Sequence, residues 1–166
     1  MTEVKRVRRV VTGQDPETGK SRIVSDSVID ATARATISIA SIWGADEAPR
    51  FPDTGAQPRA EAFFPALGGY RFIVINFPPG AGMDVPSVDP AAKPGMHKTD
   101  NVDLMVVLSG EVSLEFDSGE TVTLHAGDTM IENGTNRRWF NAGAETASLA
   151  IFLVGGHERA GVKPPL

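Results

Sequence analysis

Cysteine is absent from this 166-residue sequence, and histidine occurs at only three positions. Without thiols the chain forms no disulfide bonds, has no thiolate nucleophile and offers no cysteine ligands to zinc. No run of about 18 apolar residues is present, so the sequence predicts no membrane-spanning helix. The N-terminus alternates charge with valine and lacks the apolar region of a signal peptide. We therefore expect a cytoplasmic protein that does not associate with membranes.

Positive charge is in the minority, with 16 Lys and Arg against 21 Asp and Glu and a net charge of −5. A protein this acidic has no general electrostatic attraction to nucleic acid. The one basic cluster consists of Lys5, Arg6, Arg8 and Arg9, and no aromatic residue is interleaved with it. Because positive charge protects the exposed edge of a sheet, we interpret this cluster as a solvated edge strand. No nucleic-acid partner is expected.

Glycine and proline, by contrast, are frequent and divide the chain into short runs. Strands are predicted at 4–11, 22–25, 35–43, 71–77, 102–108, 111–116, 121–124, 129–131, 137–141 and 146–154. Short strands at spacings of roughly 8 to 12 residues are typical of an all-β sandwich or barrel. Residues 44–69 show no periodicity and are predicted to form a long loop, which serves either as a lid or as a dimer arm.

A histidine, an acidic residue and a glycine are regularly spaced where the barrel pattern begins. His97 is followed by Thr99, by Asp103 and, after six intervening residues, by Gly110. This spacing resembles the first motif of the cupin superfamily, in which two histidines precede a glutamate and a glycine. His97 matches the first histidine, Thr99 stands where the second is found, and Asp103 replaces the glutamate.

A second group of residues resembles the other cupin motif. Gly127 opens it one residue short, Gly134 matches its second glycine, Arg137 falls on its histidine and Asn141 on its asparagine. The resemblance implies an all-β fold, the double-stranded β-helix or jelly-roll barrel of the cupins. We expect a single cupin domain over residues 1–166, with N-terminal strands and a loop in 1–70 and the barrel core at about 71–155. It also implies a homodimer formed through the edges of the N-terminal strands.

Alternation along the strands predicts which side chains face the barrel interior. Two sets of positions share a face: His97, Thr99, Asp103, Met105 and Val107 in one region, and Arg137, Trp139 and Asn141 in the other. If Val107 is a core residue, two neighbouring strands direct polar groups into one apolar cavity. Such a cavity is typical of a small-molecule site. Met105 and Trp139 either line this cavity or are ordinary core residues.

The resemblance also implies three imidazoles and one carboxylate, a set that binds iron, manganese, nickel or zinc. Only His97 is placed to serve as such a ligand here. His125 precedes a turn where it should face solvent, and His157 lies beyond the last predicted strand. A divalent metal would depend on His97 and Asp103, assisted by Asp100 or Glu132.

Arg137 argues against a metal at this position. Its guanidinium stays protonated at any working pH, and once buried it needs an anionic partner. That partner is either a bound anionic ligand or an internal carboxylate, Asp103 or Asp100. In both cases the guanidinium repels a divalent cation, so we favour no metal cofactor.

Three functions remain open. The preferred one is a small-molecule enzyme of the cupin type that performs metal-independent acid–base chemistry on an organic acid or carbonyl compound, as a lyase, isomerase or decarboxylase. In it His97 is the general acid or base, Asp103 sets the tautomer of His97, and Arg137 binds the substrate anion. The other predicted substrate-binding residues are Thr99, Met105 and Trp139. The alternatives are a metal-dependent cupin such as a dioxygenase with a reduced ligand set, and a non-catalytic binding or sensor cupin.

Overall fold

The computed structural model describes residues 6–83 and 91–156, and all regular structure in them is β-strand. The strands are β1 (Arg6–Gln14), β2 (Ser21–Asp30), β3 (Thr32–Arg34), β4 (Ile37–Ala45), β5 (Tyr70–Phe77), β6 (Asn101–Ser109), β7 (Glu111–Phe116), β8 (Thr121–His125), β9 (Thr129–Asn133), β10 (Arg137–Phe140) and β11 (Ala147–Gly155). Each predicted strand overlaps one of these, which confirms the all-β prediction. The described residues contain no helix that could cross a membrane.

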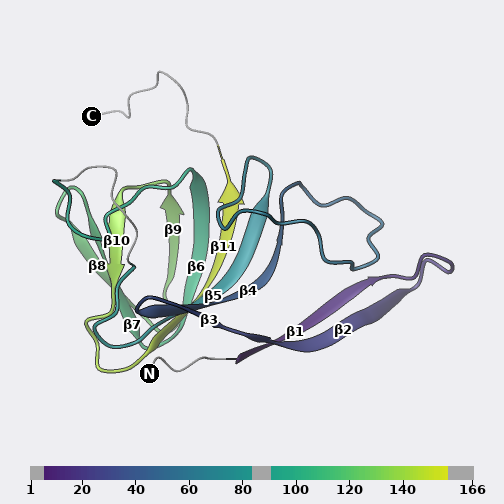
Figure 1. Cartoon of the computed structure of the whole chain (residues 1–166), viewed down its shortest axis with the longest axis horizontal. Helices are drawn as coiled ribbons and strands as arrows, with labels where there is room; N and C mark the ends of the chain where they lie inside the picture. The colour runs from purple at the N-terminus through teal and green to yellow at the C-terminus, as the bar shows by residue number, and fades with distance from the viewer. Residues whose placement is uncertain (1–5, 84–90, 157–166) are drawn as a thin grey trace, which may run out of the picture.

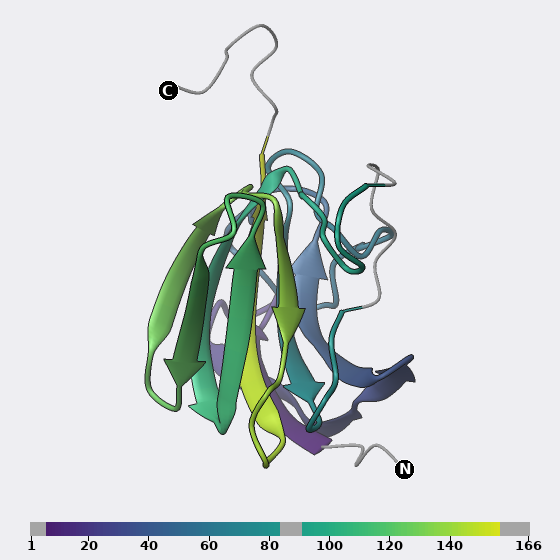
Figure 2. The ribbon, with the colours of Figure 1, turned by 90° about the vertical axis from the view of Figure 1, so that its left-hand side faces the viewer.

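The strands form three antiparallel sheets. One has six strands in the order β3–β4–β5–β11–β6–β9, a second has the order β10–β7–β8, and β1 pairs with β2 alone. Figure 1 shows β9, β6, β11, β5 and β4 side by side in that order. In Figure 2 the green three-stranded sheet faces the viewer, in front of the rest of the barrel. The two larger sheets face each other across the core.

Side chains that alternate between the inner and outer faces of the strands build this core. Its buried members include Ile73 and Ile75 of β5, Leu114 of β7, and Leu149 and Ile151 of β11. Each buried side chain of this size contributes about 1.5–3 kcal/mol relative to remaining in water. The core therefore joins the two sheets from the middle of the strands, and the ends of the strands are left to carry polar groups.

The edge of the three-stranded sheet is joined to the six-stranded sheet by short connections. Gly82 pairs with Phe140, and His97 pairs with Arg137, in isolated antiparallel bridges. The hydroxyl of Thr36 donates to the carbonyl of Gly82 at 2.7 Å. These connections fix His97 against the start of β10, opposite the residue that the second motif singles out.

The β1–β2 hairpin projects from the barrel (Figure 1). Arg6 pairs with Asp30 at 2.7 Å and Arg8 with Asp26 at 2.6 Å, both on its exposed face. This agrees with a solvated interpretation of the basic cluster, of which Lys5 lies outside the described residues. At the base of the hairpin, Val7 and Ile29 pack against the outer surface of β4 and β5.

Residues 46–69 form no strand, as predicted for a long loop. The buried guanidinium of Arg71 holds this loop in place. It donates to the carbonyl of Ala62 at 2.8 Å and of Ala45 at 2.7 Å, and it pairs with Asp46 at 2.5 Å. Phe63 of the loop then packs against the core. Part of the loop therefore covers the barrel.

Candidate functional site

The polar side chains of the barrel interior gather where β6, β9 and β10 meet the segment that carries His97. Asp103 of β6 lies directly opposite Glu132 of β9 in the antiparallel register. Arg137 opens β10 and pairs with His97. All four side chains are buried. Because like charges directly opposite one another destabilise a sheet, the two carboxylates need a cation between them.

The guanidinium of Arg137 is that cation. Its Nε lies 2.5 Å from Oε1 of Glu132, and Nη2 lies 3.4 Å from Oδ2 of Asp103. The short Nε contact is an ion pair whose geometry is not that of a hydrogen bond. Nη1 donates to the carbonyl of His97 at 3.0 Å. Of the two partners that the sequence leaves open for Arg137, the structure contains the internal carboxylates, with Glu132 closest.

Burial changes the acidity of both carboxyl groups. It raises the pKa of Glu132 to about 7, with a further rise from the charge of Asp103 and an opposing effect of Arg137. Burial also raises the pKa of Asp103, against the lowering effects of a hydrogen bond from Asn101 and of the Arg137 charge. Glu132 is therefore partly protonated near neutral pH, and the cluster carries little net charge.

The backbone of Gly95 orients the ring of His97. Gly95 has a φ of 80°, and a Cβ there would lie 2.5 Å from the carbonyl oxygen of Met83, so only glycine fits. Its carbonyl oxygen lies 2.8 Å from Nδ1 of His97. Because a carbonyl only accepts, Nδ1 carries the proton. The prediction that Asp103 sets this tautomer is wrong: Gly95 does so.

The other ring nitrogen of His97 is left free. Nε2 is buried and has no hydrogen-bond partner in the part of the chain that the structure describes. Burial lowers the pKa of His97, the charge of Arg137 lowers it further, and the hydrogen bond to Gly95 acts in the opposite direction. The imidazole is therefore neutral near pH 7 and holds an unshared electron pair on Nε2.

The other predicted substrate-binding residues occupy different positions. Thr99 is half-buried, with its hydroxyl 3.5 Å from Nη2 of Arg137. Trp139 is buried, stacks on Phe77 with 6.2 Å between ring centroids and lines the inner cavity. Met105 is a core residue that does not line this cavity.

The inner cavity lies against His97, Asp103 and Arg137, and its other walls are apolar, with Phe63 and Ile73 among them. Its volume is about 20 Å³, which is room for about one water molecule. An organic ligand therefore enters only if a wall moves. Phe63 and Phe64 belong to the loop, so this wall is not part of a strand.

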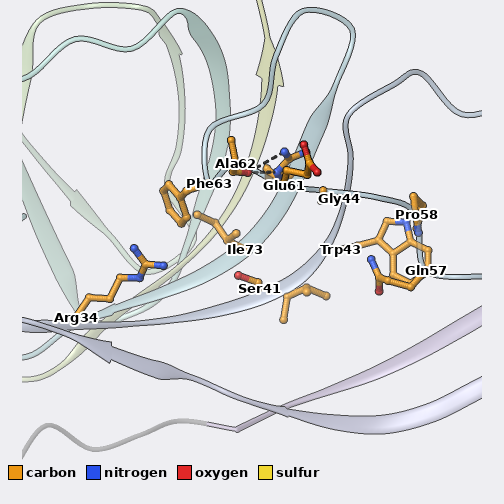
Figure 3. A pocket seen from close by; sticks show the side chains of 13 residues that line it. Arg34, Ser41, Trp43, Gly44, Gln57, Pro58, Glu61, Ala62, Phe63 and Ile73 are labelled. Atoms are coloured by element: carbon orange, nitrogen blue, oxygen red, sulfur yellow. Dashed lines mark hydrogen bonds between the residues drawn. The ribbon is translucent and has the colours of Figure 1, made fainter.

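A larger pocket of about 420 Å³ opens on the other side of Phe63 and Ile73, which line both spaces. Figure 3 shows Arg34, Phe63 and Ile73 gathered at one end of this entrance pocket and Trp43 at the other. The guanidinium of Arg34 lies 5.2 Å from the centre of the Phe63 ring. Arg34 takes part in no ion pair among residues 6–83 and 91–156. It follows Thr32 and Ala33 at the edge of the sheet and precedes Ala35, whose φ of 49° is unusual for a residue with a side chain.

The donors around His97 do not fit a divalent metal. His97 is the one imidazole of the cluster, and the Arg137 guanidinium occupies the space between the two carboxylates at 2.5 and 3.4 Å. No three His, Asp or Glu side chains gather as a metal site within the described ranges. Asp100 is exposed, and His125 is exposed beside Glu111. His157 lies outside the described residues.

Glu132 and Arg34 are the residues whose roles the sequence did not reveal. The sequence suggests Glu132 only as an auxiliary metal ligand, because nothing in a single sequence shows that β9 pairs with β6 in this register. Arg34 belongs to the three-residue strand β3, which is too short to show periodicity. In retrospect the spacing in the sequence indicates this partner. Glu132 and Arg137 are five positions apart, on either side of a turn at Gly134.

Comparison with known proteins gives a family match and partial relatives. Residues 85–154 match the family model of the cupin domain. A 79-residue stretch is 40% identical to the phomopsin biosynthesis cluster protein C' of Diaporthe leptostromiformis and covers 48% of this chain and 42% of that protein. A 92-residue stretch is 32% identical to the oryzines biosynthesis cluster protein J of Aspergillus oryzae and covers 52% and 51%. The chain thus spans about half the length of these curated relatives.

Among solved structures, the cupin domain of Cnp3 from Schizosaccharomyces pombe is similar with a TM-score of 0.50. The match has 16% sequence identity and covers 91% of this chain and 88% of that one. At 16% identity, the similarity shows that the two proteins share a fold. Together with the sheet topology, it confirms the predicted double-stranded β-helix.

Proposed function

The chain is a member of the cupin superfamily, and we propose that it is an enzyme that moves protons on a small organic acid or carbonyl compound without a metal ion. One observation supports this most directly: the buried Nε2 of His97 has no partner in the described residues, while Gly95 fixes the proton on Nδ1. A neutral, oriented imidazole beside a cavity is suited to act as a general base.

The groups around His97 suit a proton transfer that develops negative charge. Arg137 and Asp103 line the same cavity, and Arg137 keeps the cluster close to neutral. Negative charge that develops on a substrate oxygen is stabilised by a fixed cation in a site that excludes water. In this proposal Arg137 serves chiefly as an internal counter-ion.

Recognition of the substrate anion is assigned to the entrance pocket. Arg34 lacks a carboxylate partner in the described part of the chain and lines the 420 Å³ pocket next to Phe63. A carboxylate held there has its carbon chain directed past Phe63 toward His97. The biosynthesis-cluster names of the fungal relatives support a role in small-molecule chemistry.

A non-catalytic small-molecule binder is the second candidate. The observation in its favour is the inner cavity of about 20 Å³, which is too small for an organic molecule, beside an entrance pocket of about 420 Å³. We do not propose a metal-dependent dioxygenase, because the side chains around His97 do not fit a divalent metal.

Hydrogen–deuterium exchange at acidic C–H groups tests the proposal whichever overall reaction the protein catalyses. Pyruvate, phenylpyruvate and acetoacetate are incubated with the protein in D2O, and loss of the C–H signals is followed by proton NMR. We expect the native protein to accelerate exchange in at least one compound. His97→Asn keeps an N–H for the Gly95 carbonyl and removes the basic nitrogen, so the rate should fall about 100-fold or more.

His125→Asn is the matched control, because His125 is exposed and lies away from the cavity. It should exchange at the native rate. An unchanged rate in His97→Asn would contradict the role of His97. No exchange by the native protein with any of the three compounds would favour the non-catalytic binder.

A further inference from the structure

The charged side chains of the entrance pocket leave one positive charge without a partner. Within the described part of the chain, the charged residues that line the pocket are Arg34, Arg71 and Glu61. Arg71 pairs with Asp46 at 2.5 Å, and Glu61 pairs with Arg59. Arg34 is exposed and forms no ion pair with any described residue. A pocket with a single uncompensated cation is complementary to a ligand with a single anionic group.

The turn that follows Arg34 fixes the position of this cation. Ala35 has a φ of 49°, and a backbone conformation of this kind persists only where the surrounding structure holds it. Here the hydroxyl of Thr36 donates to the carbonyl of Gly82 at 2.7 Å and accepts from the N–H of the same residue at 3.3 Å. The guanidinium of Arg34 lies 5.2 Å from the centre of the Phe63 ring. The N–H groups of such a guanidinium remain available to a carboxylate, which they can bind in a bidentate manner.

The opposite end of the entrance pocket is aromatic. Figure 3 shows the indole of Trp43 there, beside Gln57 and Pro58 of the loop. The guanidinium of Arg9 lies 5.5 Å from the centre of the indole ring, and its Nη1 donates to Oε1 of Gln57 at 3.2 Å and to the carbonyl of Ile42 at 3.0 Å. These contacts join β1, β4 and the loop around one ring. A tryptophan positioned in this way offers a flat apolar surface on which another ring can stack.

The strand register sets the separation of the two ends. Arg34 lies opposite Ile37 of β4, and Trp43 follows six residues later on the same strand. Six residues of strand span about 20 Å between backbone positions, part of which the two long side chains bridge. The exposed Ser41 lies between the two ends (Figure 3). A ligand that contacts both ends is therefore elongated, whereas a three-carbon acid such as pyruvate contacts only one of them.

We propose that the entrance pocket binds monocarboxylic acids that carry an aromatic ring, with the carboxylate on Arg34 and the ring against Trp43. Its volume of about 420 Å³ is within the range of small-molecule sites. As a statement about the substrate, this inference rests on the proposed function, in which the pocket recognises the substrate anion. Phe63 and Ile73 line both this pocket and the inner cavity. The carbon atoms next to the carboxylate therefore lie closest to His97, and the ring points away from it.

A neighbouring groove on the outer side of Trp43 is less suited to such an acid. It has a volume of about 490 Å³ and is lined by Phe51, by Arg9 and by Asp53, among others. Asp53 forms no ion pair with any residue that the structure describes, so this groove presents a carboxylate as well as a cation. The carboxylate opposes an anionic ligand. Phe51 does not line the entrance pocket, so a change there is a control for the position of the ring.

Isothermal titration calorimetry of the full chain with simple phenyl acids tests the proposal without any reaction. The probes are 3-phenylpropanoate, 4-phenylbutanoate and 5-phenylpentanoate, which differ in the length of the linker. Butanoate lacks the ring, and 4-phenylbutanamide lacks the charge. We expect at least one phenyl acid to bind about tenfold or more tightly than both of these comparison compounds.

Two variants separate the two ends of the pocket. Arg34→Met should weaken binding of the tightest phenyl acid about tenfold and leave binding of the amide unchanged. Trp43→Leu should weaken it about fivefold and leave binding of butanoate unchanged. The matched controls are Arg22→Met, an exposed arginine outside the pocket, and Phe51→Leu, and both should bind as the native protein does. Near-ultraviolet circular dichroism checks that each variant keeps its tertiary packing.

Arg34 is exposed, so Arg34→Met should fold even if Trp43→Leu does not. Native affinity in Arg34→Met, or phenyl acids that bind no more tightly than butanoate, would overturn the proposal. A loss of affinity in Phe51→Leu would also overturn it and would place the ring in the neighbouring groove. The expected binding pattern without any C–H exchange would support this inference and contradict the proposed function. Exchange of pyruvate and phenylpyruvate with equal kcat/KM, unchanged in a folded Trp43→Leu, would support the proposed function and overturn this inference.

Discussion

The two faces of the six-stranded sheet reverse the usual distribution of charge. On β6, the inward Asp103 is a buried ionisable group opposite Glu132, whereas the next residue, Leu104, points outward and is 40% exposed. Burial of charge destabilises a chain unless it is paired, and exposure of large apolar groups forgoes the stabilisation of a core. Neither choice helps an isolated chain to fold. The interior face therefore carries the polar candidate site, and the exterior face is left apolar.

The largest expected effect comes from removal of the interior cation. Arg137→Met leaves the buried carboxyl groups of Asp103 and Glu132 without a counter-ion, and breaking a buried ion pair typically costs about 3–5 kcal/mol of stability. We expect the midpoint of urea unfolding at neutral pH to fall accordingly.

A triple variant is the control for this change. Arg137→Met combined with Asp103→Asn and Glu132→Gln removes all three charges, and it should recover most of the lost stability. A single Arg137→Met variant as stable as the native protein would show that charge does not govern the interior face.

The second expected effect is a dependence of stability on pH that originates in Glu132. Its pKa rises from 4.5 to about 7 on folding. Between these values the native state keeps a proton that the unfolded chain has released, so the free energy of unfolding decreases as pH rises. The contribution is about 3 kcal/mol across the interval. Denaturant unfolding at several pH values should show that Glu132→Gln lacks this decrease.

Asp103 acts in the same direction, because its pKa is also raised. The difference between native protein and Glu132→Gln isolates the contribution of Glu132. Parallel pH profiles of the two proteins would mean that Glu132 is ionised throughout and that Arg137 compensates fully for its burial.

The smallest expected effect concerns the exterior face. Ile131 is 56% exposed, so Ile131→Thr removes little buried apolar surface and should change the free energy of unfolding by no more than about 0.5 kcal/mol. Urea unfolding of this variant beside Glu132→Gln measures the difference between the two faces, and a loss as large as that of an interior variant would contradict it.

The strand pattern could be predicted from the sequence because turns and alternation are local. Residues 111–116 match β7 at both ends, and the loop predicted at 44–69 begins two residues later, because β4 continues to Ala45. The short strand β3 and the length of β2 could not be predicted, because they depend on pairing partners rather than on their own residues. The apolar runs of β6 and β11 are visible in the sequence, yet a single sequence does not show which of their two faces lies outside the barrel.

Part of the site could also be predicted, because the alternation of side chains along a strand is a local property. Alternation correctly places His97, Asp103 and Arg137 inside the barrel. The partner of Arg137 and the group that orients His97 depend on register and on backbone carbonyls, which leave no mark in side-chain identity. Gly95 is an ordinary turn residue in the sequence, and only its φ of 80° reveals that its carbonyl points at the imidazole.

Phe63 has a consequence for any binding measurement on this protein. With the ring in place, the inner cavity holds about one water molecule, so an organic molecule reaches Nε2 of His97 only in the fraction of the population whose Phe63 has moved. The apparent affinity is then the intrinsic affinity multiplied by that fraction. A smaller residue at position 63 would enlarge the competent population and tighten binding of molecules that the native barrel holds weakly.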